Sequence, residues 1–425
     1  MKNLSLQIEG NKKQIYKLQK QKLMQKFLNN IDKKVRNILM IPPDYTRKHS
    51  GTGELTAFLY QGLKNKYEIT IMPALGTHNP MTAGEIVDMF GPNIPLKKFV
   101  VHKWRKDTTK VLTIPTSYVS EITDGIVENS IEVELNQRLI GGNYDLIISI
   151  GQVLPHEVVG MANYNKNIFV GCGGSDMINK SHFVGAAYGM ERIMGRDHTP
   201  VRKLYDYAQD NLELKIPLQY ILTVNSTEVI AKTGLTRMYG IFTGKERSVF
   251  EQAVKLSQKH NINRVDKRLK KIVVYLDQEE FKSTWLGCKA IYRTRMAIAD
   301  EGELLVIAPG LNKFGEDKEI DSLIRKYGYV GRKRILELVQ NNQDLQDNLA
   351  AAAHLIHGSS DGRFKITFAC KNLTKEEIEG VNFEYMSVDK GLTKYNPDQL
   401  VDGFNQQDGE QFYYISNPAT GLWMA

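Results

Sequence analysis

The stretch YDLIISIGQVLPHE, residues 144–157, decides the fold prediction. Its apolar run at 146–150 is typical of a strand buried on both faces, as in a parallel sheet. Pro155 and His156 follow in the next loop. In open α/β sheets, ligands bind at the carboxyl ends of the strands. The stretch therefore predicts a parallel sheet with a functional site near His156.

Similar apolar runs alternate with helical patterns along the chain, which indicates α/β architecture. The predicted strands are 37–41, 68–72, 146–150, 168–170, 220–224, 271–275, 303–307 and 364–368, with a further one in the tail at 411–415. The predicted helices include 53–63, 82–90, 288–299 and one long helix at 340–357. Thr82 and Glu85 have the spacing of a capping box at the start of the second of these helices.

The chain has 425 residues, which is too long for one ordinary domain. The polar segment 260–269 is the candidate hinge. We expect two α/β, Rossmann-like domains with the active site in the cleft between them. The N-terminal domain spans 1–265 and carries the site, and the C-terminal domain, 270–400, closes over the substrate. The tail, 405–425, is expected to complete one of the two sheets, with the N-terminal domain as one option.

The composition is that of a soluble globular protein, with 42% hydrophobic and 24% charged residues and a mean hydropathy of −0.35. No stretch approaches the roughly 18 apolar residues of a membrane span, and the N-terminus lacks the apolar core of a signal peptide. We therefore expect a cytoplasmic protein without a membrane partner. Three widely spaced cysteines argue against a disulfide framework and a cysteine zinc site.

The net charge is +8, and much of the excess lies in the first 36 residues. This segment predicts a solvated, mostly helical arm. A nucleic-acid contact is the alternative, but no DNA- or RNA-binding motif supports it, and we expect no nucleic-acid partner.

The loop after the first predicted strand contains Asp44, Thr46 and Arg47. Arg47 can make a bidentate contact with a carboxylate or phosphate. Gly51 and Gly53 precede a helix whose free N–H groups favour an anion. The alternative interpretation is a surface turn with a capping pair.

Histidines follow the next two strands, as His78 and His156. A neutral imidazole is the natural base near pH 7, although a lone loop histidine is more often only solvated. The third loop continues through Lys166 and a Gly-Cys-Gly-Gly turn to His182, which is a candidate metal ligand, base or helix cap. One histidine cannot hold a metal alone, so a metal here would need most of its ligands from elsewhere.

In the second half, Lys289 follows Trp285 and is a candidate partner for a substrate carboxylate, or else ordinary helix surface. His354 and His357 share a helix face. The polar turn that follows, up to Arg363, has side chains that can grip hydroxyl groups, or it is a simple helix C-cap.

Together these loops resemble the nickel-dependent lactate racemase family of 2-hydroxyacid racemases and epimerases, over nearly the whole chain. The resemblance rests on several short motifs in the same order and at matching spacing. The matching positions are Asp44-Tyr-Thr46-Arg47, Gly76-Thr77-His78, Pro155-His156, Lys166, His182 and Lys289.

The resemblance implies a cofactor, the nickel-pincer nucleotide, which is a pyridinium-3-thioamide-5-thiocarboxylic acid mononucleotide with nickel. Lys166 would carry it covalently, and His182 would complete the nickel coordination. Asp44, Thr46 and Arg47 would also bind it. Sulfur donors with an imidazole suit square-planar nickel.

The resemblance also implies roles in the reaction. His78 and His156 would be the paired acid and base, while the cofactor takes hydride from C2 of a 2-hydroxy acid and returns it to either face. Arg47 and Lys289 would hold the carboxylate. Further substrate contacts would come from Trp285, His354, His357 and Arg363.

The chain departs from the family pattern before the cofactor lysine, where Ser-Gly-Gly-Arg is replaced by Ala-Asn-Tyr-Asn at 162–165. A Tyr-Gln pair becomes Trp285-Leu286, and 354–363 is more polar than lactate requires. These changes favour a larger 2-hydroxy acid, such as a sugar acid. The alternative is a cofactor-free sugar-acid-binding protein, or an enzyme of other chemistry on this fold. The oligomeric state stays open, with a homodimer as one option.

Overall fold

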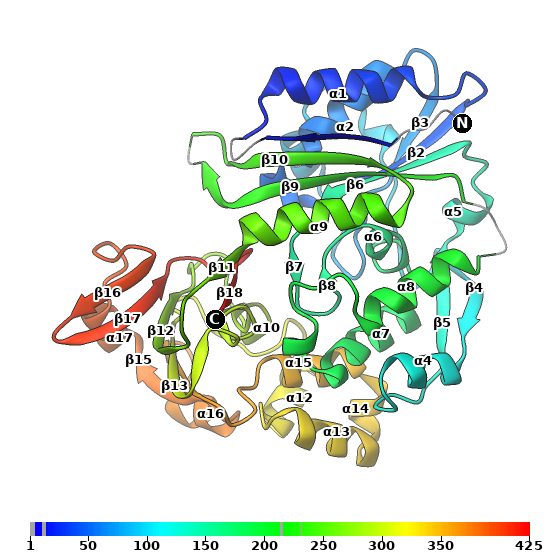
Figure 1. The fold of residues 1–425 in the computed structure, drawn as a ribbon. Coiled ribbons are helices and arrows are strands. Elements are labelled where there is room, and N and C mark those ends of the chain that lie inside the picture. Colours follow the sequence, from blue (N-terminus) through cyan, green and yellow to red (C-terminus); the bar gives the residue numbers. More distant parts are fainter. Residues whose placement is uncertain (1–4, 11–13, 213–215, 231) are drawn as a thin grey trace. The chain divides into compact units, whose positions relative to one another are not determined.

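The computed structural model describes residues 5–10, 14–212, 216–230 and 232–425. The chain forms two compact units, each considered by itself (Figure 1). Unit 1 contains 1–181 and 195–261, and unit 2 contains 182–194 and 262–425. The short segment 182–194 therefore belongs to unit 2 although it lies far from the rest of that unit in the sequence.

Unit 1 has a six-stranded sheet in the order β1-β10-β9-β6-β2-β3. The strands β3, β2, β6 and β9 pair in parallel, whereas β10 and β1 are antiparallel. Its elements are β1 (Leu6–Glu9), α1 (Lys17–Asn29), β2 (Asn37–Ile41), η1 (Tyr45–Ser50), α2 (Thr52–Leu63), β3 (Glu68–Ile71), α3 (Ala83–Phe90), η2 (Leu96–Lys98), β4 (Thr108–Ile114), α4 (Thr116–Ile122), β5 (Ile131–Asn136), α5 (Gln137–Gly141), β6 (Leu146–Gln152), β7 (Pro155–His156), β8 (Gly160–Met161), α6 (Asn165–Phe169), α8 (Pro200–Asp210), β9 (Leu218–Ile230), β10 (Leu235–Gly244) and α9 (Arg247–Asn261), while α7 (Ser175–Tyr188) runs from unit 1 into unit 2.

The core of unit 1 forms because its central strands are apolar on both faces. Every residue of β6 is buried. One face packs on α1 and α2, through residues such as Phe27 and Leu59, and α9 lies on the other side of the sheet (Figure 1). This arrangement leaves the carboxyl ends of β2, β3 and β6 to lead into the loops that carry the predicted site.

Unit 2 has a second six-stranded sheet, in the order β15-β14-β13-β12-β17-β16, parallel except for the β16–β17 pair. Its elements are η3 (Met190–Arg192), β11 (Ile262–Arg264), β12 (Leu269–Tyr275), α10 (Thr284–Gly287), α11 (Lys289–Thr294), β13 (Ile298–Ile307), α12 (Lys318–Tyr327), α13 (Arg332–Asn341), α14 (Gln343–Asp347), α15 (Leu349–His357), β14 (Lys365–Cys370), α16 (Lys375–Gly380), β15 (Glu384–Ser387), α17 (Val388–Lys394), β16 (Gly403–Gln407), β17 (Glu410–Ile415) and β18 (Leu422–Met424).

The C-terminal tail adds its strands to unit 2. β17 pairs in parallel with β12, and β18 pairs in parallel with β11. The tail therefore extends the sheet of unit 2 and not that of unit 1. The α/β prediction is confirmed, as are eight of the nine predicted strands and the capping box, in which Thr82 and Glu85 bond each other's backbone N–H groups.

Three predicted elements are wrong. The apolar run 168–170 lies at the end of helix α6 and not in a strand, because so short a run cannot distinguish the two. The predicted long helix at 340–357 is broken at Asn342 and Asn348, both outside the helical region, and the Asn348 side chain caps α15 by accepting from Ala351 N. The predicted helix at 288–299 ends at Thr294, and β13 begins at Ile298.

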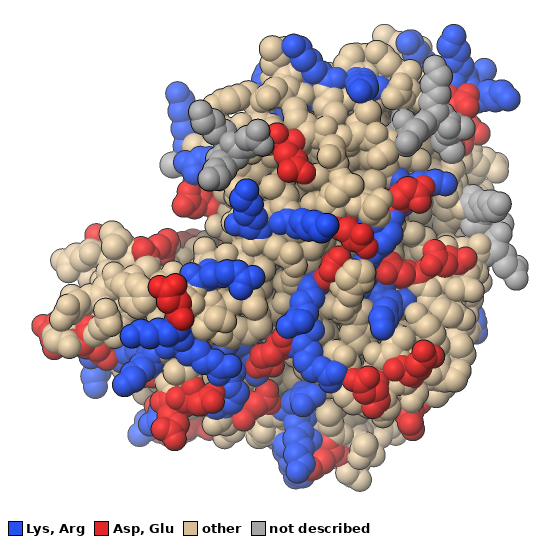
Figure 2. All heavy atoms as spheres, viewed as in Figure 1, with Lys and Arg blue, Asp and Glu red and all other residues tan. Residues whose placement is uncertain are grey.

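The surface and the helices bear on two further expectations. On the face shown in Figure 2, Lys and Arg side chains are interspersed with Asp and Glu. None of the helices in the described ranges combines the length and the apolar composition that a membrane crossing needs.

Candidate active site

Backbone hydrogen bonds join the loops that follow the parallel strands of unit 1. Ala74 N, after β3, donates to Pro42 O, after β2, at 2.9 Å. Gly76 N donates to Gly171 O, also at 2.9 Å. These bonds bring the loop of His78 beside the loop of Asp44 and beside the glycine turn that follows Lys166, as the sheet topology predicts.

The Gly-Cys-Gly-Gly turn, residues 171–174, is explained by close packing. A Cβ at Gly171 would lie 2.4 Å from Asn167 O and 2.7 Å from Ala74 Cβ, and one at Gly173 would lie 1.9 Å from Phe169 O. Only glycine fits at these positions. The turn therefore brings α6 and the His78 loop together, a role that needs no bound phosphate.

Asp44 fixes the tautomer of His78. The Asp44 Oδ2–His78 Nδ1 distance is 2.5 Å, and the Thr46 hydroxyl donates to Asp44 Oδ1 at 2.5 Å. Burial acts to raise the pKa of Asp44, but the His78 and Thr46 hydrogen bonds and the Arg47 charge outweigh it and hold the pKa below its ordinary value. Because an ionised carboxylate only accepts, Nδ1 of His78 carries a proton, and Nε2 of the neutral ring has a free lone pair.

His156 has the opposite arrangement. Its Nδ1 accepts a hydrogen bond from Val158 N at 3.1 Å, so its neutral ring carries the proton on Nε2. The His156 side chain is 12% exposed and lies 3.7 Å from the Glu157 carboxylate, whereas that of His78 is 56% exposed. In the neutral state one predicted histidine is thus ready to accept a proton at Nε2 and the other to donate one.

Lys166 lies on α6 as a half-buried amine. Within the described ranges its Nζ has no hydrogen-bond or ion-pair partner. Burial lowers its pKa to about 8; the charges of Arg47 and Arg202 act in the same direction, and Glu157 and Asp44 oppose them. An amine with this pKa is partly neutral near pH 7 and can act as a nucleophile.

Arg202, which no sequence motif singled out, holds the connection before Lys166. Arg202 is on α8 and fully buried. It donates to Met161 O at 2.6 Å and Asn163 O at 3.1 Å, and it also bonds the Asn165 side chain. Burial lowers its pKa to about 10. The pattern of α8 contains no motif that marks this arginine.

The unusual tetrapeptide at 162–165 keeps a glycine-like backbone. Asn163 has φ 67°, and Tyr164 has φ 59° and ψ −134°. Asn tolerates a positive φ, but a large aromatic residue rarely adopts one. The Tyr164 ring stacks on Phe250 at 5.1 Å, and its hydroxyl donates to Lys245 O at 3.0 Å. These contacts compensate for the strained backbone at a position where the family pattern has glycine.

In unit 2, Trp285 packs on His354 with ring centroids 4.4 Å apart. His354 is buried, and its Nε2 is 2.9 Å from the hydroxyl of Tyr329, a residue that the sequence did not single out. Burial, with the nearby His357, lowers the pKa of His354 to about 3. His354 is therefore a neutral imidazole in a fixed orientation.

The other predicted residues of unit 2 are Lys289, His357 and Arg363, and Arg363 lies apart from the other two. Lys289 Nζ is 5.5 Å from the centroid of the Phe281 ring. His357 is buried, and the centroid of its ring is 6.3 Å from that of Tyr292. Arg363 instead pairs with Asp300 at 2.9 Å and Glu191 at 3.5 Å, and it lines a separate cavity of this unit.

The predicted metal ligand His182 lies on α7 and is half-buried. It is the first residue of the segment 182–194 that belongs to unit 2.

Residues 3–192 match the family model of the lactate racemase N-terminal domain. This part of the chain is similar to a lactate racemase N-terminal domain. The match spans the loops of Asp44, His78 and His156 together with Lys166 and His182, so the resemblance found in the sequence is confirmed. No curated protein sequence matches the chain.

Two solved structures share the fold of this chain. A crystal structure of a protein from Thermotoga maritima has a TM-score of 0.81 and 22% identity, over 98% of this chain and 99% of that one. The lactate racemase apoprotein from Thermoanaerobacterium thermosaccharolyticum has a TM-score of 0.70 and 15% identity, over 94% and 89% of the two chains. At these identities the likeness concerns the fold.

Proposed function

We propose that this chain is a racemase or epimerase of a 2-hydroxy acid that works with a nickel-pincer nucleotide. The observation that carries the proposal is the pair of histidines with opposite neutral tautomers, His78 and His156, whose loops adjoin those of Asp44 and the partly neutral Lys166. Inversion at C2 needs one group that accepts a proton and one that donates it.

The residues present fit the cofactor. Lys166 is a nucleophilic amine without a competing partner in the described ranges, which suits a covalent anchor. His182 would supply the single imidazole that a tridentate pincer leaves for the protein. Asp44, Thr46 and Arg47 are on the loop after β2, which adjoins the loop of His78. They would contact the rest of the nucleotide. When bound, the cofactor supplies the acceptor for the hydride that leaves C2.

The side chains of the protein would manage the protons. Nε2 of His78 accepts the hydroxyl proton of one enantiomer while Asp44 stabilises the imidazolium that forms. Nε2–H of His156 donates a proton to the carbonyl oxygen when the alcohol is restored on the other face. Both rings return to the neutral state when His156 takes up a proton from solvent and His78 releases one.

We propose Arg47 as the carboxylate partner, because guanidinium matches a carboxylate bidentately. Lys289, Trp285, His354 and His357 are the proposed substrate contacts from unit 2. The neutral imidazole of His354 and the hydroxyl of Tyr329 are uncharged polar groups. Such groups suit the hydroxyls of a sugar acid better than the methyl group of lactate.

The test is to produce the chain together with the cofactor pathway and to measure intact mass, nickel content and racemisation of a panel of 2-hydroxy acids. We expect near-stoichiometric nickel, added mass on the Lys166 peptide and turnover. Lys166→Ala should lose all three, whereas Lys203→Ala, which removes an exposed lysine on α8, should keep them. Unmodified mass, no nickel and no turnover in the wild-type protein would refute the proposal.

A further inference from the structure

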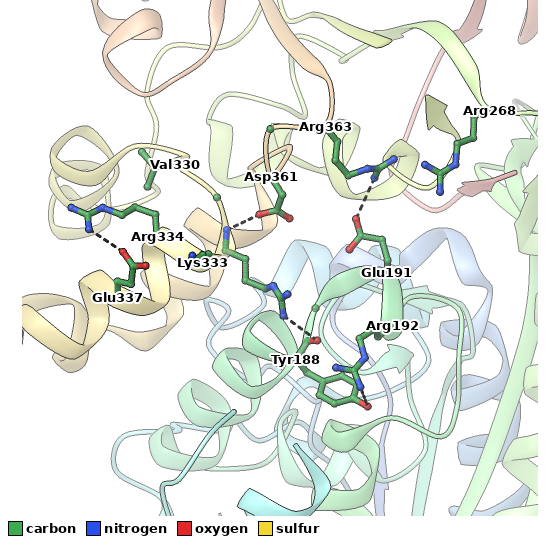
Figure 3. Close-up of a pocket in the computed structure, with 14 residues that line it drawn as sticks. Tyr188, Glu191, Arg192, Arg268, Val330, Lys333, Arg334, Glu337, Asp361 and Arg363 are labelled. Atoms are coloured by element: carbon green, nitrogen blue, oxygen red, sulfur yellow. Dashed lines mark hydrogen bonds and ion pairs between the residues drawn. The ribbon is translucent and has the colours of Figure 1, made fainter. Parts of the chain in front are cut away.

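Unit 2 contains a cavity of about 850 Å³ whose lining includes Arg363 but none of Lys289, Trp285, His354 and His357, the substrate contacts proposed above. It lies between the end of α7 with η3, the start of α13, and the turn at 361–363 (Figure 3). Every lining residue belongs to unit 2. Cavities of this size accommodate small-molecule ligands.

The lining of the cavity is strongly cationic. Six lining residues are Lys or Arg and three are Asp or Glu. Two of the three acids are already paired with Arg295, which is outside the lining and only 2% exposed: its Nε is 2.6 Å from Glu191 and its Nη2 is 2.8 Å from Asp361. The third acid, Glu337, pairs with Arg334 at 3.1 Å. Arg268 and Arg363 share Asp300, which is outside the lining, at 3.4 and 2.9 Å. The positive charge that these carboxylates leave uncompensated comes mainly from the start of α13.

Two of these cations have no carboxylate partner among the described residues. Arg332 Nη1 donates to the carbonyls of Ala187 at 2.9 Å and Tyr188 at 3.4 Å, which hold its side chain in place without neutralising it. Lys333 is exposed and forms no ion pair there. Both are in the first turn of α13, where the helix dipole adds further positive potential.

A third cation is held in position on the opposite wall. The Arg192 guanidinium stacks over the Tyr188 ring at 3.6 Å and donates to the Tyr188 hydroxyl at 2.6 Å, as Figure 3 shows. This contact covers one face of the Tyr188 ring, so that face is not available to stack on a nucleobase. Side chains that are already ordered lose little entropy when they bind a ligand.

We infer that this cavity is a second binding site, for a small phosphate-bearing anion. A phosphate group carries up to two negative charges and three acceptor oxygens, so it can meet cations from several directions at once. A carboxylate is planar and carries a single charge. The site is independent of the proposed racemase chemistry, because none of the proposed catalytic or cofactor residues lines it.

The test is calorimetric titration of the full-length, cofactor-free chain with pyrophosphate, with citrate and acetate as comparison anions at equal ionic strength. We expect pyrophosphate to bind at least ten-fold more tightly than citrate, and acetate not to bind. The double variant Arg332→Gln/Lys333→Gln should weaken pyrophosphate binding at least ten-fold. Lys333→Glu should also weaken pyrophosphate binding. Because the Lys333 side chain is exposed, this single substitution should leave the fold intact.

The matched control is Lys365→Gln/Lys375→Gln, which removes two exposed positive charges of unit 2 outside the cavity and should change the affinity less than two-fold. Absence of pyrophosphate binding, equal loss in the control, or tighter binding of citrate would each overturn the inference. Because the titration uses cofactor-free protein, its failure leaves the proposed function untouched, and failure of the proposed function leaves the site untouched.

Discussion

At the scale of single residues, the site depends on how Asp44 orients His78. Asp44→Asn keeps the shape of the side chain but removes the charge, and its amide can then donate to a ring nitrogen as well as accept from one. His78 would lose its fixed tautomer, and the imidazolium would lose its counter-charge. We expect the racemisation kcat of the loaded enzyme to fall roughly 10²- to 10⁴-fold.

Glu132→Gln is the matched control for Asp44→Asn, because it removes one carboxylate from an exposed ion pair with Lys110. Its kcat should stay within two-fold of the wild-type value. An Asp44→Asn enzyme with wild-type kcat and an unchanged pH profile would show that Asp44 does not orient the catalytic base.

Lys166 should react as an amine with a lowered pKa. Because its pKa is about 8, the neutral fraction should rise as the pH passes through 8, well before that of an ordinary lysine. Pulse acetylation of cofactor-free protein between pH 6 and 11, read by mass spectrometry of the Lys166 peptide, measures this rise. Arg202→Met removes a charge that lowers this pKa, so the midpoint should move upward.

Lys203→Met is the control, since it removes an exposed cation from the same helix as Arg202. Its midpoint for Lys166 should match that of the wild-type protein. A wild-type midpoint at or above pH 10 would contradict the environment described for Lys166.

The positions of His78, His156 and Lys166 could be predicted from the sequence, but their surroundings could not. The spacing of His78, His156 and Lys166 follows from the chain itself, because each comes after an apolar strand or at a fixed interval from one. Arg202 reaches the site from another helix and carries no local signal. The tautomers of the two histidines depend on Asp44 and on a backbone N–H, which are contacts that only the folded chain creates.

At the scale of elements, the connection before α6 concentrates the strain. Tyr164→Ala and Tyr164→Gly remove nearly the same contacts, but only glycine adopts φ 59° and ψ −134° without cost. Both variants should be less stable than the wild-type protein. We expect Tyr164→Gly to be more stable than Tyr164→Ala by about 1–2 kcal/mol in urea unfolding.

Tyr205 provides the matched comparison, because it is equally buried but lies inside the regular helix α8. There the order should reverse, with Tyr205→Ala more stable than Tyr205→Gly by about 1 kcal/mol. If alanine were the better replacement at both positions, the backbone at Tyr164 would not be strained.

Most elements could be predicted because their patterns are long and consistent. The buried parallel strands are continuous apolar runs, and these predictions are confirmed. The errors occur where local preference is ambiguous: a three-residue apolar run became part of α6, and two asparagines, Asn342 and Asn348, divided what looked like one helix. Asparagine caps helices and also occurs inside them, so only tertiary packing decides between the two.

At the scale of the whole molecule, the chain passes through unit 2 twice. The segment 182–194 leaves the N-terminal half of the sequence and packs in unit 2, where Glu191 pairs with the buried Arg295 at 2.6 Å. A sequence boundary near 265 could not reveal this, because nothing in the local pattern of 182–194 differs from its surroundings. Unit 2 is therefore a discontinuous structure, and its stability depends on a distant part of the chain.

This discontinuity can be tested with Glu191→Gln. The change removes a carboxylate partner from Arg295, whose side chain is only 2% exposed, and leaves a buried guanidinium less well compensated. We expect a loss of roughly 3 kcal/mol in the stability of unit 2, visible as faster hydrogen exchange in the strands β12–β14. Glu384→Gln, which breaks an exposed pair with Lys365, should cost less than about 1 kcal/mol. Equal effects of the two substitutions would mean that the segment 182–194 contributes nothing special to unit 2.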